Sequence, residues 1–328
     1  MTRASVTGYA RLHFGFCNLS LARERLYGSV GVGLDRPSIR VTATPAADVR
    51  CAHPTVREYA ARSVDLLDVS GADLTVESEF PRHVGLGSGT QFALATLVAV
   101  ARAHDETVDA REAAPELGRG GRSGIGVATF DDGGFVLDAG HPTTRFTTDR
   151  PALGRWSVPP VAARHPIPDD WRFLVVVPDA SAGPSGDDED RSMRSAVESA
   201  SPSQSDRLAG GIARRGLPAI TEGSAERFGA AVADVGRLNG TWYADEQGGV
   251  YRPPAGELVA ALDDSPTVYG AGQSSWGPAV YGVTDAERVA AAREAGRAAL
   301  DAAGVDGRVL VAEGRNRGVS VDAERRND

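Results

Sequence analysis

The chain has 328 residues, of which 41% are hydrophobic and 24% charged, values typical of a folded globular protein rather than a disordered one. A net charge of −9 argues against nonspecific nucleic-acid binding, which needs a surplus of positive charge. The longest apolar run, residues 92–101, is too short to span a membrane, and the first 16 residues show no signal-peptide pattern. We therefore expect a cytoplasmic protein without nucleic-acid or membrane partners.

Lysine is absent from the sequence, so all 35 basic residues are arginines. A GC-rich genome and the high-salt cytoplasm of a halophilic archaeon both favour such a composition. Without lysine the chain cannot form a Schiff base with pyridoxal phosphate (PLP) or use a lysine as a phosphate clamp. Only two cysteines occur, Cys17 and Cys51, and they belong to no CxxC or Cys/His cluster. This excludes a disulfide framework and gives no indication of zinc.

In the first half of the chain, hydrophobic periodicity predicts alternating strands and helices. The predicted elements are strands at 4–16, 29–45 and 72–80, a helix at 54–68, a long apolar helix from Ser88 and a short helix at 109–117. A second glycine-rich turn at 118–124 then leads into a short helix and a buried strand.

Regular patterning fades over residues 142–168, where proline and arginine become frequent, and we interpret this stretch as a linker. It predicts a first domain of residues 1–155 and a second of residues 156–328. The elements predicted after it are strands at 171–180, 267–270 and 308–313, an acidic loop at 181–190, helices at 204–215, 217–238 and 285–303, and a last short strand. Such alternation favours an α+β or α/β protein with a two-layer sandwich in each half.

The glycine-rich loop before the long helix is the strongest indication of a ligand site. It consists of Gly85, Leu86, Gly87, Ser88, Gly89, Thr90 and Gln91. A helix start presents unpaired amides and the positive end of the helix dipole, and the glycines let an anion approach the main chain. The GxGxG spacing fits neither a Walker loop nor the dinucleotide fingerprint. A phosphate or diphosphate cradle is one interpretation, and a core helix with closely packed glycines is the other.

Three motifs resemble those of the GHMP superfamily of galacto-, homoserine, mevalonate and phosphomevalonate kinases. The stretch PRHVGLGSGTQFAL is similar to the central phosphate-binding motif, GAGQSSWGPAVYG to the C-terminal glycine motif and ARLHFGF to the N-terminal substrate motif. Their order and spacing extend the resemblance over almost the whole chain. It implies an α+β, GHMP-kinase-like fold of two domains. These would be an N-terminal α/β sandwich carrying the phosphate loop and a C-terminal ferredoxin-like domain, with the active site between them.

One position departs from the kinases. Those of the mevalonate type carry Ser-Gly-x-Asp after the second turn, with the aspartate as catalytic base, whereas this chain reads Ser-Gly-Ile-Gly at 123–126. Gly126 cannot accept a proton. The extended motifs, including GRGGRSGIGVATFDDGGFVLDAGH and the late EGRNRGVSV, resemble the β-ribofuranosylaminobenzene 5′-phosphate synthase family of this superfamily. That family joins 5-phosphoribosyl 1-diphosphate to 4-aminobenzoate or 4-hydroxybenzoate, with loss of diphosphate and carbon dioxide, in tetrahydromethanopterin biosynthesis.

The resemblance implies a site built on positioning and electrostatics, without a covalent nucleophile. For catalysis we expect Arg11, His13, Asp138 and Gln273. For the phosphate and diphosphate groups we expect Gly85, Gly87, Ser88, Gly89, Thr90, Gln91, Arg122 and Ser123. For the remaining substrate contacts we expect Arg25, Arg119, His141, Ser274, Ser275 and Trp276. Arginine forks suit both the 5′-phosphate and the benzoate carboxylate.

Several of these residues also have a purely structural interpretation. His13 fits a hydrogen-bonded core histidine, Asp138 and His141 fit residues that fix a strand end, and Ser123 fits a helix cap. The acidic run 187–190 is either a solvated loop or, through Glu189, a magnesium ligand. Diphosphate chemistry and the resemblance imply Mg²⁺, with ligands left open, and a homodimer. The alternatives to the synthase are a GHMP small-molecule kinase with Asp131 or Asp132 as a displaced base, and a noncatalytic ligand-binding protein.

Overall fold

The computed structural model describes residues 2–145, 151–181, 183 and 187–325. Its strands are β1 (Thr2–Asn18), β2 (Arg25–Pro45), β3 (Arg50–Cys51), β4 (Ala72–Ser78), β5 (Phe135–Asp138), β6 (His141–Pro142), β7 (Val161–His165), β8 (Trp171–Pro178), β9 (Ala271–Gln273), β10 (Val280–Asp285), β11 (Gly307–Glu313) and β12 (Ser320–Arg325). Its α-helices are α1 (Pro54–Leu67), α2 (Ser88–Ala103), α3 (Ala110–Ala113), α4 (Ile125–Asp131), α5 (Asp187–Ser199), α6 (Pro202–Gly211), α7 (Leu217–Thr221), α8 (Ala225–Trp242), α9 (Ala244–Gln247), α10 (Ala255–Asp263) and α11 (Val289–Ala303). Short 3₁₀ and π segments lie at η1 (Thr143–Arg145), η2 (Ile212–Gly216) and η3 (Ala286–Arg288).

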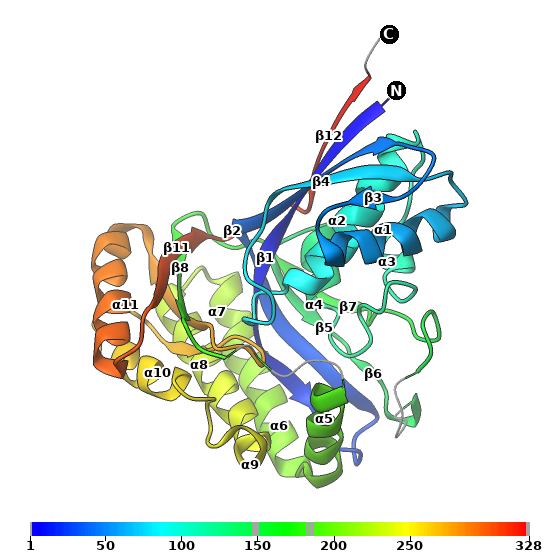
Figure 1. Ribbon diagram of the computed structural model, residues 1–328. Helices are drawn as coiled ribbons and strands as arrows, with labels where there is room; N and C mark the ends of the chain where they lie inside the picture. The colour runs from blue at the N-terminus through cyan, green and yellow to red at the C-terminus, as the bar shows by residue number, and fades with distance from the viewer. Residues whose placement is uncertain (1, 146–150, 182, 184–186, 326–328) are drawn as a thin grey trace.

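A large sheet forms around the long antiparallel pair β1 and β2 (Figure 1). Its main path runs β12-β1-β2-β4-β3, and β5, β6 and β7 extend it beside β2. Both β7 and β12 come from beyond residue 155, so the sheet combines residues from either side of the expected domain boundary. The expected linker 142–168 accordingly contributes a strand, β7, which pairs with β5. Residues 146–150 of that stretch lie outside the described residues.

The second sheet has the order β11-β8-β10-β9 and is antiparallel throughout. The strand β8 is buried on both faces, as its apolar sequence predicts. Phe173 and Val175 pack into the core that contains Phe228 of α8, whereas Leu174 and Val176 pack into a separate core with α10 and α11. This sheet, with its helices, forms the second layer of the molecule and lies beside β1 and β2 in Figure 1.

The helix α2 occupies the centre of the first half, packed against β1, β2 and α1. Almost every residue from Gln91 to Ala101 is buried, which explains why its sequence is apolar on all sides. It begins after Gly87, whose φ of 85° lies in the left-handed region that glycine adopts without strain. The loop and the helix predicted from the sequence are therefore present. The loop lies beside β1, because the Arg11 amide of β1 donates to the Leu86 carbonyl at 3.1 Å.

Three sequence expectations need correction. The strand expected at 267–270 begins later, at β9, although Tyr269 and Gly270 already exchange main-chain hydrogen bonds with Val283 of β10. The helix expected at 217–238 is broken into α7 and α8, since Ser224 caps a new start by accepting from the Arg227 amide. The acidic loop becomes helical from Asp187, where carboxylates at a helix start are favoured by its dipole.

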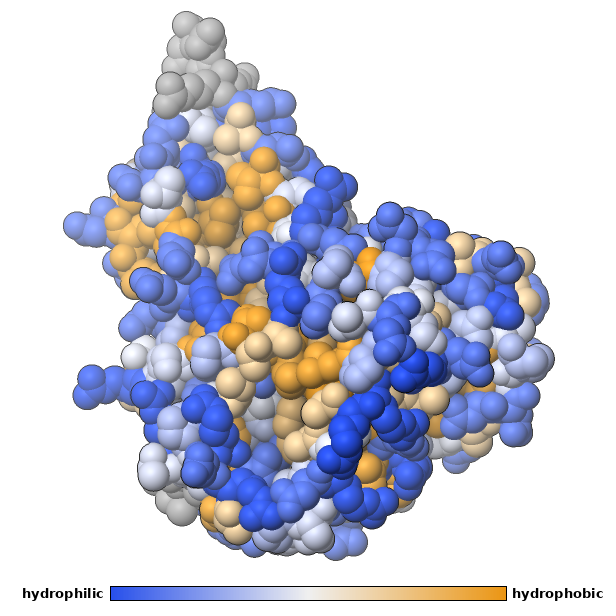
Figure 2. Space-filling model, turned by 180° about the vertical axis from the view of Figure 1, so that it is seen from behind, coloured by the Kyte–Doolittle hydropathy of each residue, from blue (hydrophilic) through white to orange (hydrophobic). Residues whose placement is uncertain are grey.

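None of the described helices has the length and apolar character required to cross a membrane. Figure 2 shows the molecule from behind: hydrophilic residues cover most of this face, and hydrophobic ones gather near its centre and close to the chain ends.

Candidate active site

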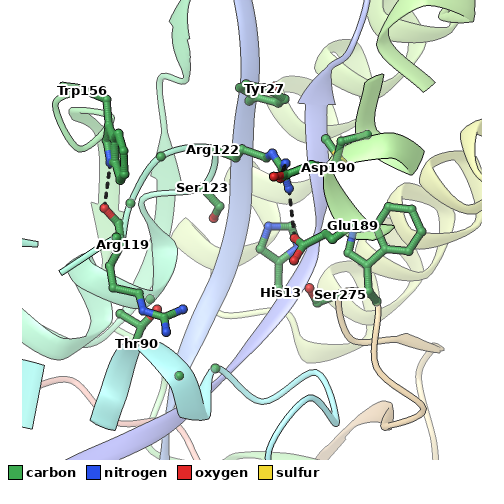
Figure 3. Close-up of a pocket in the computed structure, with 18 of the residues that line it drawn as sticks. His13, Tyr27, Thr90, Arg119, Arg122, Ser123, Trp156, Glu189, Asp190 and Ser275 are labelled. Carbon is green, nitrogen blue, oxygen red and sulfur yellow. Dashed lines mark hydrogen bonds and ion pairs between the residues drawn. The ribbon is translucent and has the colours of Figure 1, made fainter. Parts of the chain in front are cut away.

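A cavity of about 1210 Å³ lies at the glycine-rich loop. It is bounded by β1 and the start of β2, by the second glycine turn at 118–123, by the first turns of α5 and by the loop after β9. Figure 3 shows side chains from these separate elements pointing toward one another, with His13, Glu189 and Ser275 on one side and Arg119, Thr90 and Trp156 on the other. The site is thus assembled from both sheets.

The start of α2 is open to this cavity. Gly87 precedes the helix and no side chain caps it; the Thr90 amide donates to the Gly87 carbonyl at 3.1 Å, and the Ser88 and Gly89 amides before it are left for a ligand. Gly85, with φ 95°, packs so closely that an added Cβ would lie 2.1 Å from the Ser274 carbonyl oxygen. At Gly89 a Cβ would lie 3.0 Å from a guanidinium nitrogen of Arg119. Because these glycines lack side chains, the main chain of the loop packs directly against Arg119 and against the loop after β9.

The start of α4 is closed by the protein itself. Asp138 accepts from the Gly124 amide at 2.8 Å, from the Gly140 amide at 2.9 Å and from the Ser29 hydroxyl. The Ser123 hydroxyl lies beside the same turn and accepts from the Ile125 amide at 3.2 Å. Asp138 is only 1% exposed and does not line the cavity. Burial raises the pKa of this carboxyl, although the hydrogen bonds it accepts act in the opposite direction.

The cavity is strongly positive although the chain is acidic. Among the described residues, seven arginines line it against two carboxylates, a net charge of +5 when the neutral histidines are left out. The arginines are Arg11, Arg82, Arg119, Arg122, Arg145, Arg155 and Arg194. Since the whole chain carries −9, this concentration of charge indicates a ligand with several anionic groups.

Two of these arginines are fixed beside the loop. Arg11 donates to the Gly85 carbonyl at 2.5 Å, and its stem packs over Gly87. Burial lowers the pKa of Arg11 to about 10, so it stays charged at neutral pH. Arg119 lies against the Tyr59 ring, 5.4 Å from its centroid, and its carbonyl accepts from the Trp156 indole at 2.9 Å.

Arg122 lines the cavity and is paired there with carboxylates. It forms ion pairs with Glu189, at 3.1 Å, and with Asp190, both in the first turn of α5 (Figure 3). The acidic run predicted as a possible metal ligand thus supplies two carboxylates to the cavity wall. The single guanidinium of Arg122 offsets one of their two negative charges.

Other features also mark the cavity as a ligand site. Among the described residues, buried polar atoms without a hydrogen-bond partner include Arg11 Nε, His13 Nδ1 and His141 Nε2, and all three residues line it. Tyr27, His83 and Ser275 line it too, with positive φ values of 68°, 58° and 56°. Unpaired polar atoms and backbone strain are costly, and they concentrate where a ligand is bound.

Most of the expected site residues line the cavity. They are Arg11, His13, Gly85, Gly87, Ser88, Gly89, Thr90, Arg119, Arg122, Ser123, His141, Ser275 and Trp276. The remaining ones do not line it: Arg25, Gln91, Asp138, Gln273 and Ser274.

The roles expected for these remaining residues stay predictions, but each of their side chains is hydrogen-bonded to main chain. Gln91 accepts from the Tyr9 amide and donates to the Gly126 carbonyl, and Arg25 donates to the carbonyls of Ala139 and Gly140. Ser274 accepts from the His13 amide at 3.1 Å and donates to the Gly85 carbonyl at 2.7 Å. Gln273 accepts from the Arg252 amide at 2.8 Å and donates to the Ser275 carbonyl at 3.1 Å. These contacts favour positioning roles for the five residues.

Sequence reasoning missed several cavity residues, namely Tyr27, Arg82, Arg145, Arg155, Trp156 and Arg194. Most lie outside the recognised motifs, on segments that only the fold brings together. The one sequence signal for these arginines was the complete replacement of lysine by arginine, and it does not indicate which arginines lie together in the fold.

Comparisons with known proteins agree with this geometry. The family described as GHMP kinases N terminal domain matches residues 49–134. A beta-ribofuranosylphenol 5′-phosphate synthase of Methanothermobacter thermautotrophicus is 36% identical, covering 94% of this chain and 95% of the relative. The protein of the same name from Archaeoglobus fulgidus is 32% identical, covering 95% and 97%.

The fold is also found in solved kinase structures. Homoserine kinase from Cytophaga hutchinsonii matches with a TM-score of 0.63 at 17% identity, over 97% of both chains. Lactococcus lactis galactokinase matches with a TM-score of 0.69 at 11% identity, over 97% of this chain and 95% of that one. At such low identity these matches show the fold alone, and they confirm the GHMP-kinase-like architecture.

Proposed function

The chain belongs to the β-ribofuranosylphenol 5′-phosphate synthase family, and on this premise we propose that it joins 5-phosphoribosyl 1-diphosphate to 4-hydroxybenzoate. The products are β-ribofuranosylphenol 5′-phosphate, carbon dioxide and diphosphate, and the step belongs to methanopterin biosynthesis. Of the two acceptors that the sequence left open, we choose 4-hydroxybenzoate because the relatives' name specifies a phenol.

The charge of the cavity carries this proposal. The two substrates bring a monoester phosphate, a diphosphate and a carboxylate, and the described lining of the cavity offers seven arginines against two carboxylates. Guanidinium groups bind phosphate and carboxylate through two parallel hydrogen bonds, which fix orientation as well as position. A site with this excess of positive charge holds both substrates in the orientation for reaction, and the reactivity comes from the activated ribose.

The diphosphate fits the start of α2. There the first-turn amides, the helix dipole and the charged Arg11 and Arg119 meet at one point. As the bond from C1 of ribose to the diphosphate breaks, negative charge builds up on the leaving group. Fixed donors aimed at that charge lower the barrier without needing to reorganise.

Phosphoryl transfer by a kinase-type base has less support. A Cβ on Gly126 would lie 3.2 Å from Thr90 Oγ1 and 3.3 Å from Thr90 Cβ, so the kinase aspartate does not fit without displacing Thr90. The substitute bases considered from the sequence, Asp131 and Asp132, do not line the cavity. Burial raises the pKa of Asp131 to about 7, but away from the phosphate loop.

Glu189 and Asp190 are the residues that we propose to hold Mg²⁺. Their side chains present carboxylate oxygens to the cavity, and a guanidinium now takes the place of a cation there. No cluster of three or more metal-ligating side chains occurs in the described part of the chain. This agrees with a metal held by one or two carboxylates and by substrate phosphates. When bound, Mg²⁺ would offset the charge of the diphosphate. A homodimer, small-molecule partners only and a cytoplasmic location complete the proposal.

One incubation tests the function. The purified protein is given 5-phosphoribosyl 1-diphosphate, Mg²⁺ and 4-hydroxybenzoate labelled in its carboxyl carbon, and labelled carbon dioxide and diphosphate are measured. We expect both in equal amounts, and less from labelled 4-aminobenzoate. A parallel incubation with ATP and homoserine or mevalonate should give no phosphorylated product. Phosphorylation of an alcohol, with no labelled gas from either benzoate, would overturn the proposal.

A further inference from the structure

His13 is held in place by its main chain, while its ring is left to the cavity. Its amide donates to Ser274 Oγ at 3.1 Å, and its carbonyl accepts from the Ser275 amide at 3.1 Å. Register irregularities lie on both sides of it in the pairing of β1 with β2, and such bulges redirect side chains. Between these irregularities the strand alternates in the ordinary way, so Leu12 and Phe14 enter the core, whereas Arg11 and His13 face the cavity.

The fold makes little use of the imidazole. The side chain is 4% exposed, and Nδ1 is buried without a hydrogen-bond partner. The ring packs edge-on against Phe16, with 5.1 Å between centroids. Burial, assisted by the charge of Arg11, lowers the pKa of His13 to about 3. The imidazole is thus neutral at physiological pH and can act as an acceptor.

His13 also lies between two parts of the site that differ in their lining. On one side lies the arginine-lined anion site; on the other is an annex of about 40 Å³. Aromatic side chains surround this junction: Phe16 and Trp276 line both spaces, and Tyr243 packs on Trp276 at 4.2 Å between ring centroids. Arg11, two residues earlier on the same face of the strand, contacts the phosphate loop at Gly85. Residues so spaced lie about 6–7 Å apart, close to the length of a benzene ring with two para substituents.

Resting on the proposed function, we propose that the aromatic acceptor lies between the diphosphate site and the side chains of Phe16 and Trp276, with its hydroxyl hydrogen-bonded to His13. His13 takes the phenolic proton as the ring attacks the ribose and returns it afterwards. The annex is too small for the ring itself, so it receives only the hydroxyl end. His13 would then be a catalytic residue. An amino group in that place would bring a second N–H with no acceptor assigned to it, and burying it unpaired is costly.

The step balances without a co-reactant. The bond from C1 of ribose to the diphosphate breaks, and its electron pair leaves on the diphosphate. Ring electrons form the new bond between C1 and the carbon that bears the carboxylate, while the phenolic proton passes to His13. The bond to the carboxylate then breaks, its electron pair restores the aromatic ring, and carbon dioxide leaves. The phenolate finally recovers its proton from His13.

The weakness of His13 as a base suits this role. In the free acceptor the phenol is a much weaker acid than protonated His13, so the proton stays on the phenol. During attack the phenolic oxygen becomes carbonyl-like, and its proton becomes far more acidic. Transfer therefore occurs only as the transition state forms, which is where an interaction accelerates a reaction.

The test compares His13→Gln with the wild type on two acceptors. Glutamine can accept a hydrogen bond but cannot take the proton. With 4-hydroxybenzoate we expect kcat to fall by about 10²–10⁴-fold, the usual range for general base catalysis, while the Kd for 5-phosphoribosyl 1-diphosphate changes less than about threefold. With 3,5-difluoro-4-hydroxybenzoate, which is already ionised at neutral pH, the ratio of wild-type to variant kcat should shrink by at least about tenfold.

His141→Gln is the matched control, because it removes another buried histidine from the same cavity. Its defect should be equal on the two acceptors. An equal loss on both acceptors for His13→Gln, or no loss at all, would overturn the role of His13. If glutamine prevents binding of 5-phosphoribosyl 1-diphosphate, the smaller His13→Asn carries the same comparison. A wild-type protein inactive on every benzoate would instead refute the proposed function, so the two failures are distinct.

Discussion

Two helix starts in the first half of the chain look alike in sequence and differ in structure. Both α2 and α4 follow a glycine-rich turn that ends in a serine-containing stretch. At α2 no side chain caps the helix and the amides face the cavity. At α4 the place of an anion is taken by Asp138, which lies inside the fold and accepts from the Gly124 amide.

The difference shows that a glycine-rich helix start attracts negative charge without determining its source. At α2 the charge must come from outside, because arginines surround the start and the described carboxylates of the cavity are paired with Arg122. At α4 it comes from the end of β5. The start of α2 therefore binds the ligand, whereas the start of α4 stabilises the fold. Substitutions at the two should affect ligand affinity and stability separately.

Gly87→Val should have the largest effect on ligand binding. Valine at φ 85° is strained, and its Cβ would lie 3.1 Å from Arg11 Cγ, displacing the side chain beside the loop. Losing two charge-assisted hydrogen bonds would raise the Kd for 5-phosphoribosyl 1-diphosphate by about 10³-fold, measured by calorimetry. Gly248→Val is the control, because Gly248 has φ 81° with nothing near its Cβ. Both variants should lose similar stability, and normal affinity in Gly87→Val would show that the loop is structural.

Asp138→Ala should have the largest effect on stability. Removing the carboxylate leaves the donors of Gly124, Gly140 and Ser29 without their partner, and we expect the free energy of unfolding in urea to fall by about 3 kcal/mol. The exposed Asp206→Ala, which breaks an ion pair with Arg23, should cost less than about 1 kcal/mol. Below its unfolding temperature Asp138→Ala should still bind 5-phosphoribosyl 1-diphosphate. Unchanged stability with lost turnover would restore the catalytic role first expected for Asp138.

Ser123→Ala should have the smallest effect, and it refines the comparison, because Ser123 both lines the cavity and accepts from the Ile125 amide at the start of α4. That hydrogen bond contributes about 1 kcal/mol to stability. The Kd for 5-phosphoribosyl 1-diphosphate should then rise less than about threefold. Ser224→Ala, which removes the cap of α8, should lower stability by a similar amount. A tenfold weaker Kd with unchanged stability would instead identify Ser123 as a phosphate donor.

Sequence patterns correctly predicted features that depend on neighbouring residues. The apolar run 171–180 became β8, buried on both faces, and the loop before Ser88 became an open helix start. The motifs alone predicted the family and the fold. They were less informative about individual side chains, because a motif residue such as Gln273 or Ser274 serves equally well by holding a loop against its neighbour.

The sequence by itself determined the periodicity of the elements, the glycines that allow close approach, the missing kinase base at Gly126 and the exclusive use of arginine. Each follows from residue type and spacing along the chain. Only the tertiary structure decided which charges meet. Arg82, Arg145, Arg155 and Arg194 converge on one cavity, and Asp138 turns inward to α4. Electrostatic attraction and burial depend on distances through space, and distant segments acquire those distances only when the chain folds.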